Sequence, residues 1–229
     1  MESGRSQEIL SVSAVSLTDA QGFETILEDI SFSVNRGDRL GIMGPSGAGK
    51  TSLLRLLNRL SEPTQGVIHF EDKPFSQIPV LSLRRQIVLV PQEPKLLGMT
   101  VKDSLIYPLQ LQQLKTGEIE SRREYYCQLL KIPDEWLERN ELQLSLGQRQ
   151  LVTITRGLMM QPKVLLLDEP TSALDADKSD HLMSVLIDLS QTQDLTILMV
   201  NHQQRIIDQF ASQVLSLLEG KLASIKNQR

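Results

Sequence analysis

A short glycine-rich segment in the first quarter of the chain is followed directly by a lysine and a hydroxyl group. It reads Gly44-Pro45-Ser46-Gly47-Ala48-Gly49-Lys50-Thr51, and Ser52 comes next. Glycines at this spacing let backbone N–H groups close around phosphate oxygens, and the lysine reaches the outer phosphates. The Thr51 hydroxyl is placed to hold Mg²⁺. The segment therefore predicts a site for the phosphates of ATP or GTP.

This phosphate-binding loop requires a strand before it and a helix after it. The apolar run Arg39 to Met43 indicates the strand, and Leu53, Leu56, Leu57 and Leu60 recur at helical spacing. The N-terminus of that helix would point its N–H groups at a bound anion. The flanking sequence therefore supports the phosphate site.

Two adjacent carboxylates follow another apolar run. Val164 to Leu167 is typical of a buried strand, and Asp168 and Glu169 come directly after it. Side chains alternate along a strand, so we expect the two carboxylates to point in opposite directions and to do different work. Asp168 is expected to orient Mg²⁺ through a water molecule, and Glu169 to position or deprotonate the water that attacks the terminal phosphate. The pair predicts hydrolysis of the nucleotide.

A further motif narrows the class. Leu144-Ser145-Leu146-Gly147-Gln148 opens a predicted helix, with Leu151, Ile154 and Leu158 on one face. It resembles the signature sequence of ABC-transporter ATPases, usually written Leu-Ser-Gly-Gly-Gln. The other marks of that family stand in the expected order: Gln92 at the Q-loop, Ser172-Ala173-Leu174-Asp175 at the D-loop, and the switch histidine His202.

The resemblance implies a catalytic set and a mode of assembly. Glu169, His202 and Gln92 are the implied catalytic residues, and Gln92 joins Thr51 and Asp168 at the Mg²⁺ that binds with ATP. Two copies are expected to pack head to tail as a homodimer. Ser145, Gly147 and Gln148 of one copy then cap the phosphate held by Lys50 of the other, and Asp175 lies at the same shared site.

The resemblance also implies a partner. Relatives dock on a separate integral membrane permease, which would place this chain at the cytoplasmic side of the cell membrane as a peripheral subunit. The implied docking surface lies beside Gln92, over about Glu93 to Pro108. The segment Pro94 to Pro108 is similar to the small ATPases of iron-export and aluminium-tolerance transporters, which implies metal-ion export.

Two other functions stay open. One is a soluble ABC-type ATPase switch in repair or translation, although such relatives generally fuse two cassettes or insert coiled-coil or basic arms, and this chain has neither. The other is a nucleotide-binding module without turnover, against which Glu169 and His202 argue.

The sequence departs from the family pattern at two places. Leu146 stands where the signature usually has its first glycine, and we expect altered packing there rather than lost binding. The aromatic residue that commonly stacks on adenine is not evident between Thr18 and Gly22. Phe23 is the nearest candidate, and its alternative interpretation is a hairpin residue packed on the core.

These motifs predict an α/β fold of the P-loop NTPase (RecA-like) type. Short apolar runs suit a parallel sheet buried on both faces; they are Gln86 to Val90, Lys163 to Leu167, Leu195 to Val200 and Val214 to Leu218. Alternation over Glu8 to Asp19 and Leu27 to Val34, with Gly66 to Phe70, predicts an N-terminal antiparallel β subdomain. One ABC ATPase domain is expected over 8–223, with a helical subdomain inserted at about 91–150. In the insertion we expect helices that begin at Thr100 and stop before Pro133, and we expect a frayed tail over Lys226 to Arg229.

Composition limits the partners, the disulfide bonds and the cellular location that we expect for the chain. The 229 residues carry a formal net charge of -4, which gives no basic footprint for extended contact with nucleic acid, so we expect no nucleic-acid partner, although a local basic patch stays open. Cys127 is the single cysteine, which excludes an internal disulfide, and we expect it to be a buried apolar residue. Neither a signal sequence over Met1 to Gln7 nor an apolar run of about 20 residues is evident, so we expect a cytosolic chain.

Overall fold

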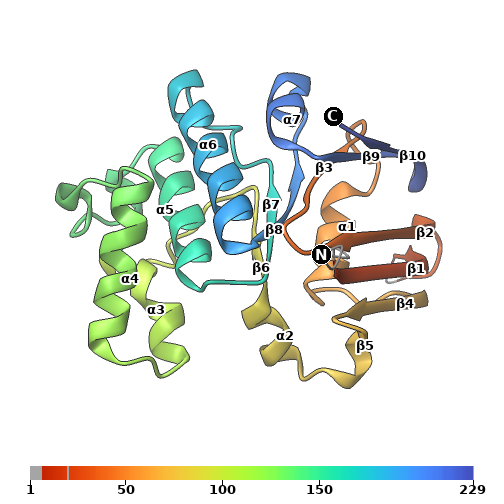
Figure 1. Cartoon of the computed structure of the whole chain (residues 1–229), viewed down its shortest axis with the longest axis horizontal. Helices are drawn as coiled ribbons and strands as arrows, with labels where there is room; N and C mark the ends of the chain where they lie inside the picture. Colours follow the sequence, from red (N-terminus) through yellow and green to blue (C-terminus); the bar gives the residue numbers. More distant parts are fainter. Residues whose placement is uncertain (1–6, 20, 229) are drawn as a thin grey trace, which may run out of the picture.

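Two β-sheets form one half of the protein (Figure 1). The computed structural model describes residues 7–19 and 21–228. The smaller sheet is antiparallel with strand order β2-β1-β4-β5. Its strands are β1 (Glu8–Thr18), β2 (Thr25–Asn35), β4 (Gln65–Phe70) and β5 (Lys73–Pro74). The prediction of an antiparallel N-terminal sheet is therefore confirmed.

The larger sheet has the strand order β10-β9-β3-β8-β7-β6. Neighbouring strands from β9 to β6 are parallel, and β10 adds an antiparallel edge. The strands are β3 (Arg39–Met43), β6 (Ile87–Val90), β7 (Val164–Asp168), β8 (Thr196–Val200), β9 (Gln213–Leu218) and β10 (Lys221–Asn227). Every residue of β7 and β8 is buried, as expected for central strands that are covered on both faces.

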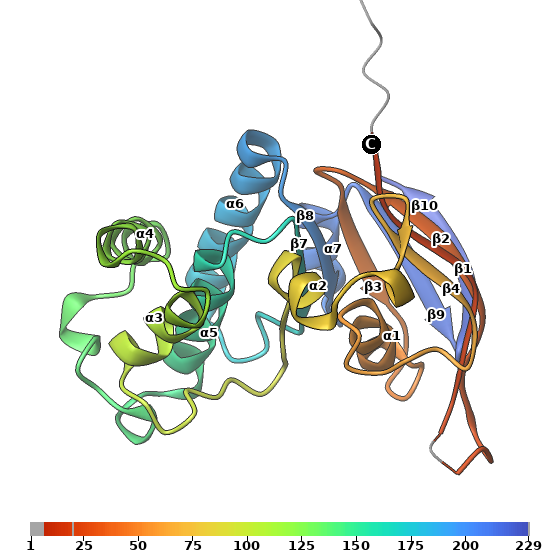
Figure 2. The ribbon, with the colours of Figure 1, turned by 90° about the horizontal axis from the view of Figure 1, so that it is seen from below.

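Helices cover both faces of the larger sheet. Helix α1 (Lys50–Leu57) lies between the two sheets, and its leucines share one apolar core with both (Figure 2). The other face packs against α5 (Leu146–Met159), α6 (Ala176–Gln193) and α7 (Gln204–Phe210) in a second core. A further helix, α2 (Val80–Gln86), leads into β6.

A group of helices lies at the end of the protein opposite the antiparallel sheet (Figures 1 and 2). It consists of α3 (Val101–Leu111), α4 (Thr116–Leu129) and α5. The Thr100 hydroxyl accepts a hydrogen bond from the Asp103 N–H and so caps α3, a helix that begins at the predicted position. The single tryptophan, Trp136, is 8% exposed in this group, in a 3-10 turn (Asp134–Trp136) after α4.

One prediction about segment ends is confirmed and another is wrong. The helical stretch stops before Pro133, as expected, since α4 ends at Leu129 and a 3-10 turn follows Pro133. The tail expected to fray pairs with β9 as far as Asn227, because a turn at Gly220 returns the chain along the sheet edge. Two parts of these predictions lie outside the described residues. They are Arg229 in the tail and Met1 to Ser6 in the N-terminal segment where no signal sequence is expected.

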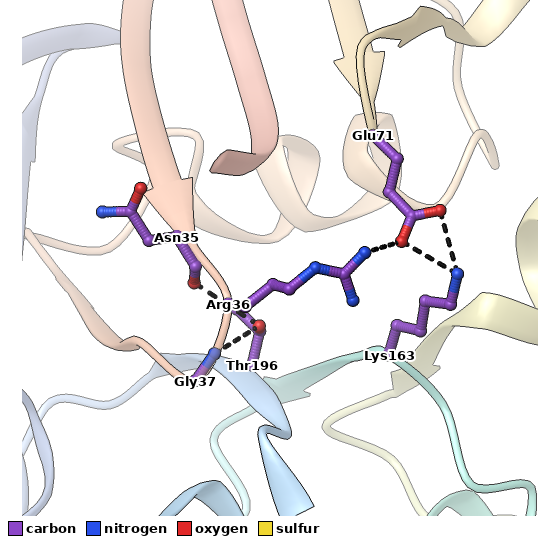
Figure 3. Close-up of polar contacts among 6 residues, drawn as sticks. All are labelled: Asn35, Arg36, Gly37, Glu71, Lys163 and Thr196. Atoms are coloured by element: carbon purple, nitrogen blue, oxygen red, sulfur yellow. Dashed lines mark hydrogen bonds and ion pairs between the residues drawn. The ribbon is translucent and has the colours of Figure 1, made fainter. Parts of the chain in front are cut away.

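An ion cluster joins the two sheets at the edge where the parallel strands begin (Figure 3). The Glu71 carboxylate, after β4, pairs with the Arg36 guanidinium and accepts from Lys163 Nζ at 2.8 and 2.9 Å. Beside it, the Thr196 hydroxyl accepts from the Gly37 N–H at 3.1 Å. One carboxylate thus fixes the antiparallel sheet to the strands that carry the chemistry at their other ends.

No helix in residues 7–19 and 21–228 combines the length and the apolar character needed to cross a bilayer.

Candidate functional site

The phosphate-binding loop connects β3 to α1, as the sequence predicts. Gly44, Gly47 and Gly49 have φ values of 150°, 80° and 91°, which L side chains rarely adopt. A Cβ would lie 2.3 Å from the Leu217 carbonyl oxygen at Gly44 and 2.6 Å from Leu27 Cδ2 at Gly49, whereas at Gly47 it would meet open space. Packing and conformation therefore both require glycine at the two ends of the loop.

Lys50 begins α1 and is 7% exposed. Its ammonium donates hydrogen bonds to the carbonyl oxygens of Gly44 at 2.9 Å and Pro45 at 2.8 Å, so the side chain folds back over the loop. Burial lowers the pKa of Lys50, and the charges of Glu169 and Asp168 oppose that change. The loop thus has one buried cation at its centre.

Asp168 ends β7 and is 4% exposed. Its Oδ2 accepts from the Thr51 hydroxyl at 2.8 Å, and Oδ1 is buried without a hydrogen-bond partner in the described chain. Burial raises the pKa of Asp168, which the hydrogen bond from Thr51 partly offsets. A buried carboxylate oxygen beside a hydroxyl is a ligand pair that suits Mg²⁺, so the residues present fit that ion.

Glu169 leaves the strand in the left-handed conformation, with φ 49°. Its Oε2 accepts from Gln92 Nε2 at 3.1 Å, and His202 Nε2 lies 2.9 Å from Oε1. These partners follow β6 and β8, the two neighbours of β7 in the sheet. The carboxylates of Asp168 and Glu169 therefore have different partners, and Glu169 lies beyond the end of β7, where strand alternation does not apply to it.

A pocket of about 480 Å³ lies over the phosphate-binding loop. It is lined by Ile26, Ser46, Gly47, Gly49, Lys50, Thr51, Ser52, Gln92, Glu169 and His202. Residues that the sequence places far apart are thus brought to one site. Sequence reasoning missed Ile26, a partly buried residue of β2, and strand alternation alone gives no signal for it.

Phe23 does not contribute to the described lining of this pocket. Its side chain is 88% exposed, which contradicts the alternative interpretation of a residue packed on the core. The reason is local: Asp19 Oδ1 accepts from the N–H groups of Phe23 and Glu24 and closes a turn that projects from the sheet. Adenine stacking by Phe23 stays a prediction.

The signature segment begins α5 and has its own geometry. Ser145 Oγ accepts from the Gln148 N–H at 3.2 Å, and Gln148 Oε1 accepts from the Ser145 N–H at 2.8 Å, which is a complete capping box. A Cβ at Gly147 would lie 2.4 Å from the Ala173 carbonyl oxygen, so the helix packs directly on the D-loop. Leu146 is 49% exposed. None of these residues is among the described lining of the phosphate pocket.

Asp175 also lies outside that lining. Its carboxylate caps α6 by accepting from the Lys178 N–H at 2.9 Å and pairs with the Lys178 ammonium. The hydrogen bonds from Lys178 lower the pKa of Asp175. In the single chain this residue therefore serves as a helix cap.

A glycine-rich loop between a parallel strand and a helix, with a buried aspartate at the end of another parallel strand of the same sheet, defines a P-loop nucleotide-binding protein. The pattern of the family described as ABC transporter matches residues 27–172. The chain therefore belongs to the ABC transporter family, as an ATP-binding domain, and the α/β fold prediction is confirmed.

Similar sequences come from plants and bacteria. Protein STAR1 of Oryza sativa subsp. japonica is 36% identical over 91% of this chain, and ABC transporter I family member 17 of Arabidopsis thaliana is 34% identical over 87%. The methionine import ATP-binding protein MetN of Desulfitobacterium hafniense is 37% identical over 86%. The chain spans 59% of the rice and MetN proteins and 75% of the Arabidopsis protein.

Solved structures cover nearly the whole chain. The ATP-binding cassette MJ0796, as a post-hydrolysis dimer bound to ADP and Pi, superposes with a TM-score of 0.90 at 25% identity, covering 96% of this chain and 99% of that one. The cbiO1 protein of Clostridium perfringens, part of the ABC transporter complex cbiONQ, gives a TM-score of 0.86 at 28% identity, with 97% and 89% covered.

Proposed function

We propose that the chain hydrolyses ATP and that Glu169 is the general base. The observation that carries this proposal is the Glu169 carboxylate, which lines the same pocket as Lys50 and is held through both oxygens by Gln92 and His202. A general base must lie within hydrogen-bond reach of the water that it deprotonates, and its direction must be fixed. Contacts from two different strand ends meet the second requirement.

In the proposed reaction a water molecule attacks the terminal phosphorus of ATP. The water oxygen forms the new P–O bond, its proton goes to the Glu169 carboxylate, and the bond to the bridging oxygen breaks to release ADP. Lys50 binds the phosphates and balances their charge. His202 keeps the carboxylate directed at the water, and Gln92 does so from the opposite side.

Magnesium, when it is bound with the nucleotide, neutralises charge on the phosphate oxygens. The groups of this chain that would hold it are the Thr51 hydroxyl, the unpartnered Oδ1 of Asp168 and the Gln92 amide. Support comes from the burial of Asp168, since a carboxylate oxygen is not normally buried without a partner.

We further propose that two copies share each ATP. The capped N-terminus of α5, with Ser145, Gly147 and Gln148, is an anion-binding element that lies apart from the pocket of its own chain, so it is available to a second copy. Asp175 would lie at the same shared site. The cassette MJ0796, which is similar over 96% of this chain, is a dimer with ADP and Pi bound.

The partner that we propose is a separate integral membrane permease, with this chain as a peripheral subunit at the cytoplasmic face. Its docking surface would be Glu93 to Pro108, which comprises the loop after β6 and the first two turns of α3. We propose that residues 8–223 form one ATPase unit and that its helical subdomain, over about 91–150, contains this docking surface. We propose a metal ion as the exported cargo, because Pro94 to Pro108 resembles the small ATPases of iron-export and aluminium-tolerance transporters.

The substitution Glu169→Gln tests the hydrolysis step. The amide keeps the length of the side chain but cannot take a proton, so we expect nucleotide to bind and steady phosphate release to fall by about 10²-fold or more. In Mg-ATP the variant should elute as a dimer in size-exclusion chromatography, and the matched control Lys50→Ala should bind ATP weakly and stay monomeric. Wild-type turnover by Glu169→Gln would rule out the base, and a monomer at saturating Mg-ATP would rule out the shared site.

Co-purification from solubilised membranes tests the partner. An integral membrane protein should be recovered with the chain, and substitutions in Glu93 to Pro108 should abolish its recovery without changing nucleotide binding. Vesicles that contain both proteins should then accumulate or release iron or aluminium ions with ATP. Methionine is the comparison cargo, because a similar protein is named for methionine import; transport of methionine alone would reject the metal proposal.

A further inference from the structure

The helix that follows the signature segment contains a buried amide without hydrogen bonds. Gln150 in α5 is 0% exposed, and neither Nε2 nor Oε1 has a partner among the residues that the structure describes. Two threonines of the same helix differ, since Thr153 and Thr155 donate to the carbonyl oxygens of Arg149 and Leu151. A buried amide that has lost its hydrogen bonds to water requires an explanation.

The neighbours of Gln150 on its face of the helix locate it. One turn earlier, a Cβ at Gly147 would lie 2.4 Å from the Ala173 carbonyl oxygen, after β7. Two turns later, a Cβ at Gly157 would lie 2.9 Å from Val90 Cγ2, at the end of β6. Positions three and seven residues apart share a helix face. Gln150 therefore faces the region between the D-loop and the end of β6, about 10 Å from Gly157 along the axis at roughly 1.5 Å per residue.

That region is bounded by the two loops that carry the chemistry. β6 leads to Gln92, and β7 leads through Glu169 to the D-loop. The same helix begins with the Ser145 cap of the signature. Gln150 is thus a buried polar group between the element that would bind the partner copy's nucleotide and the loops that hold the general base.

We propose that Gln150 is a positioning residue that couples the signature segment, residues 144–148, to the loops after β6 and β7. The inference rests on the proposed function. When two copies close on ATP, α5 shifts against these loops, and the Gln150 amide forms hydrogen bonds with their backbone groups. The arrangement in which the amide has partners is thereby favoured over the one in which it has none.

The size of this preference follows from the number of bonds. Two hydrogen bonds of ordinary net strength correspond to roughly a 30-fold change in the equilibrium between the two arrangements. A leucine at this position fills a similar volume and has no polar group to satisfy. It removes the preference without leaving a cavity, so it separates coupling from folding.

The experiment compares Gln150→Leu with Thr155→Val, a buried position of the same helix whose hydroxyl is bound locally. For Gln150→Leu we expect a melting temperature at or above that of wild type and ATP binding to the monomer within about twofold. Dimer formation with Mg-ATP, measured in the Glu169→Gln background, should weaken roughly 30-fold, and turnover should fall about tenfold or more. Thr155→Val should leave dimer formation and turnover unchanged. If leucine lowers the melting temperature, the unbranched Gln150→Met takes its place.

Wild-type dimer formation and turnover in Gln150→Leu or Gln150→Met would overturn the inference, because the amide would then have only a local structural role. Failure of the proposed function would give a different result: the unsubstituted chain would show no ATP hydrolysis and no nucleotide-dependent dimer.

Discussion

Gly147 and Gly117 are each the second residue of a helix, but an added methyl group would meet different surroundings at the two positions. At Gly147 a Cβ would lie 2.4 Å from the Ala173 carbonyl oxygen, whereas at Gly117 nothing lies within 4 Å. The first separation is roughly 1 Å less than a normal non-bonded contact. The substitution Gly147→Ala must therefore move α5, the D-loop or both.

The magnitude follows from two opposed contributions. Overpacking by one methyl group costs about 1–3 kcal/mol, and replacing a helical glycine by alanine contributes up to about 1 kcal/mol of stability. We expect Gly147→Ala to lower the free energy of unfolding by about 1–2 kcal/mol. For a domain of this size that corresponds to a melting temperature lower by roughly 2–8 °C. Gly117→Ala should leave the melting temperature unchanged or raise it slightly.

The two alanine variants should also differ in activity. Ala173 lies two residues before Asp175, so a displaced D-loop should lower the ATP turnover of Gly147→Ala but not that of Gly117→Ala. Thermal unfolding followed by circular dichroism and steady-state phosphate release measure the two effects. If Gly147→Ala is as stable as Gly117→Ala, the close packing of the signature helix on the D-loop is refuted.

Three other outcomes can be measured on single variants or on the native chain. Burial raises the pKa of Glu71, but the hydrogen bonds and charges of Lys163 and Arg36 outweigh this effect, so the pKa lies below its usual 4.5 and the cluster stabilises the fold above that pH. Glu71→Gln should therefore lower the melting temperature at pH 7 by about 2–4 °C, because a partly exposed ion pair contributes about 1 kcal/mol. Equal stability of the variant and the wild type at pH 7 would contradict this. Loss of the cluster as pH falls through the lowered pKa should also make the difference between them shrink below pH 4.5. Burial raises the pKa of Cys127 to about 11, so iodoacetamide at pH 8 should not label the folded chain but should label it in denaturant, as detected by mass spectrometry. Rapid labelling of the folded chain would instead show an accessible thiolate. Burial also raises the pKa of Asp168, so its charge destabilises the fold at neutral pH, and Asp168→Asn should increase the free energy of unfolding by about 1 kcal/mol and so raise the melting temperature. The same variant should lose the Mg²⁺ dependence of ATP binding in titration calorimetry. Unchanged Mg²⁺ dependence would exclude Asp168 from the metal site.

The sequence was informative where one local pattern has one physical solution. Val164 to Leu167 is apolar at every position and is followed by two carboxylates, which favours a short strand covered on both faces, as β7 is. The glycines at 44 and 49 are required by backbone conformation, so their spacing alone predicted the loop. The same holds for the start of α3 at Thr100, because a cap depends on residues only three positions apart.

The remaining features depend on contacts between distant segments. Ile26 lines the pocket because β2 crosses the phosphate-binding loop, and nothing in its local alternation indicates this. The left-handed turn at Glu169 could not be predicted, because glutamate has no preference for that conformation. The Glu71 cluster joins residues 36, 71 and 163, and no spacing rule relates them. The roles of the site residues and the subdomain limits stay predictions until the variants are measured.

Trp136 gives the protein a built-in optical probe. Because it is the single indole and lies near the end of α4, α5 and the first turns of α6, fluorescence emission reports on the unfolding of the helical end of the molecule. Circular dichroism in the strand region instead follows the two sheets. Coincident melting curves would mean that both ends unfold as one cooperative unit, and an earlier change in fluorescence would mean that the helical end opens first.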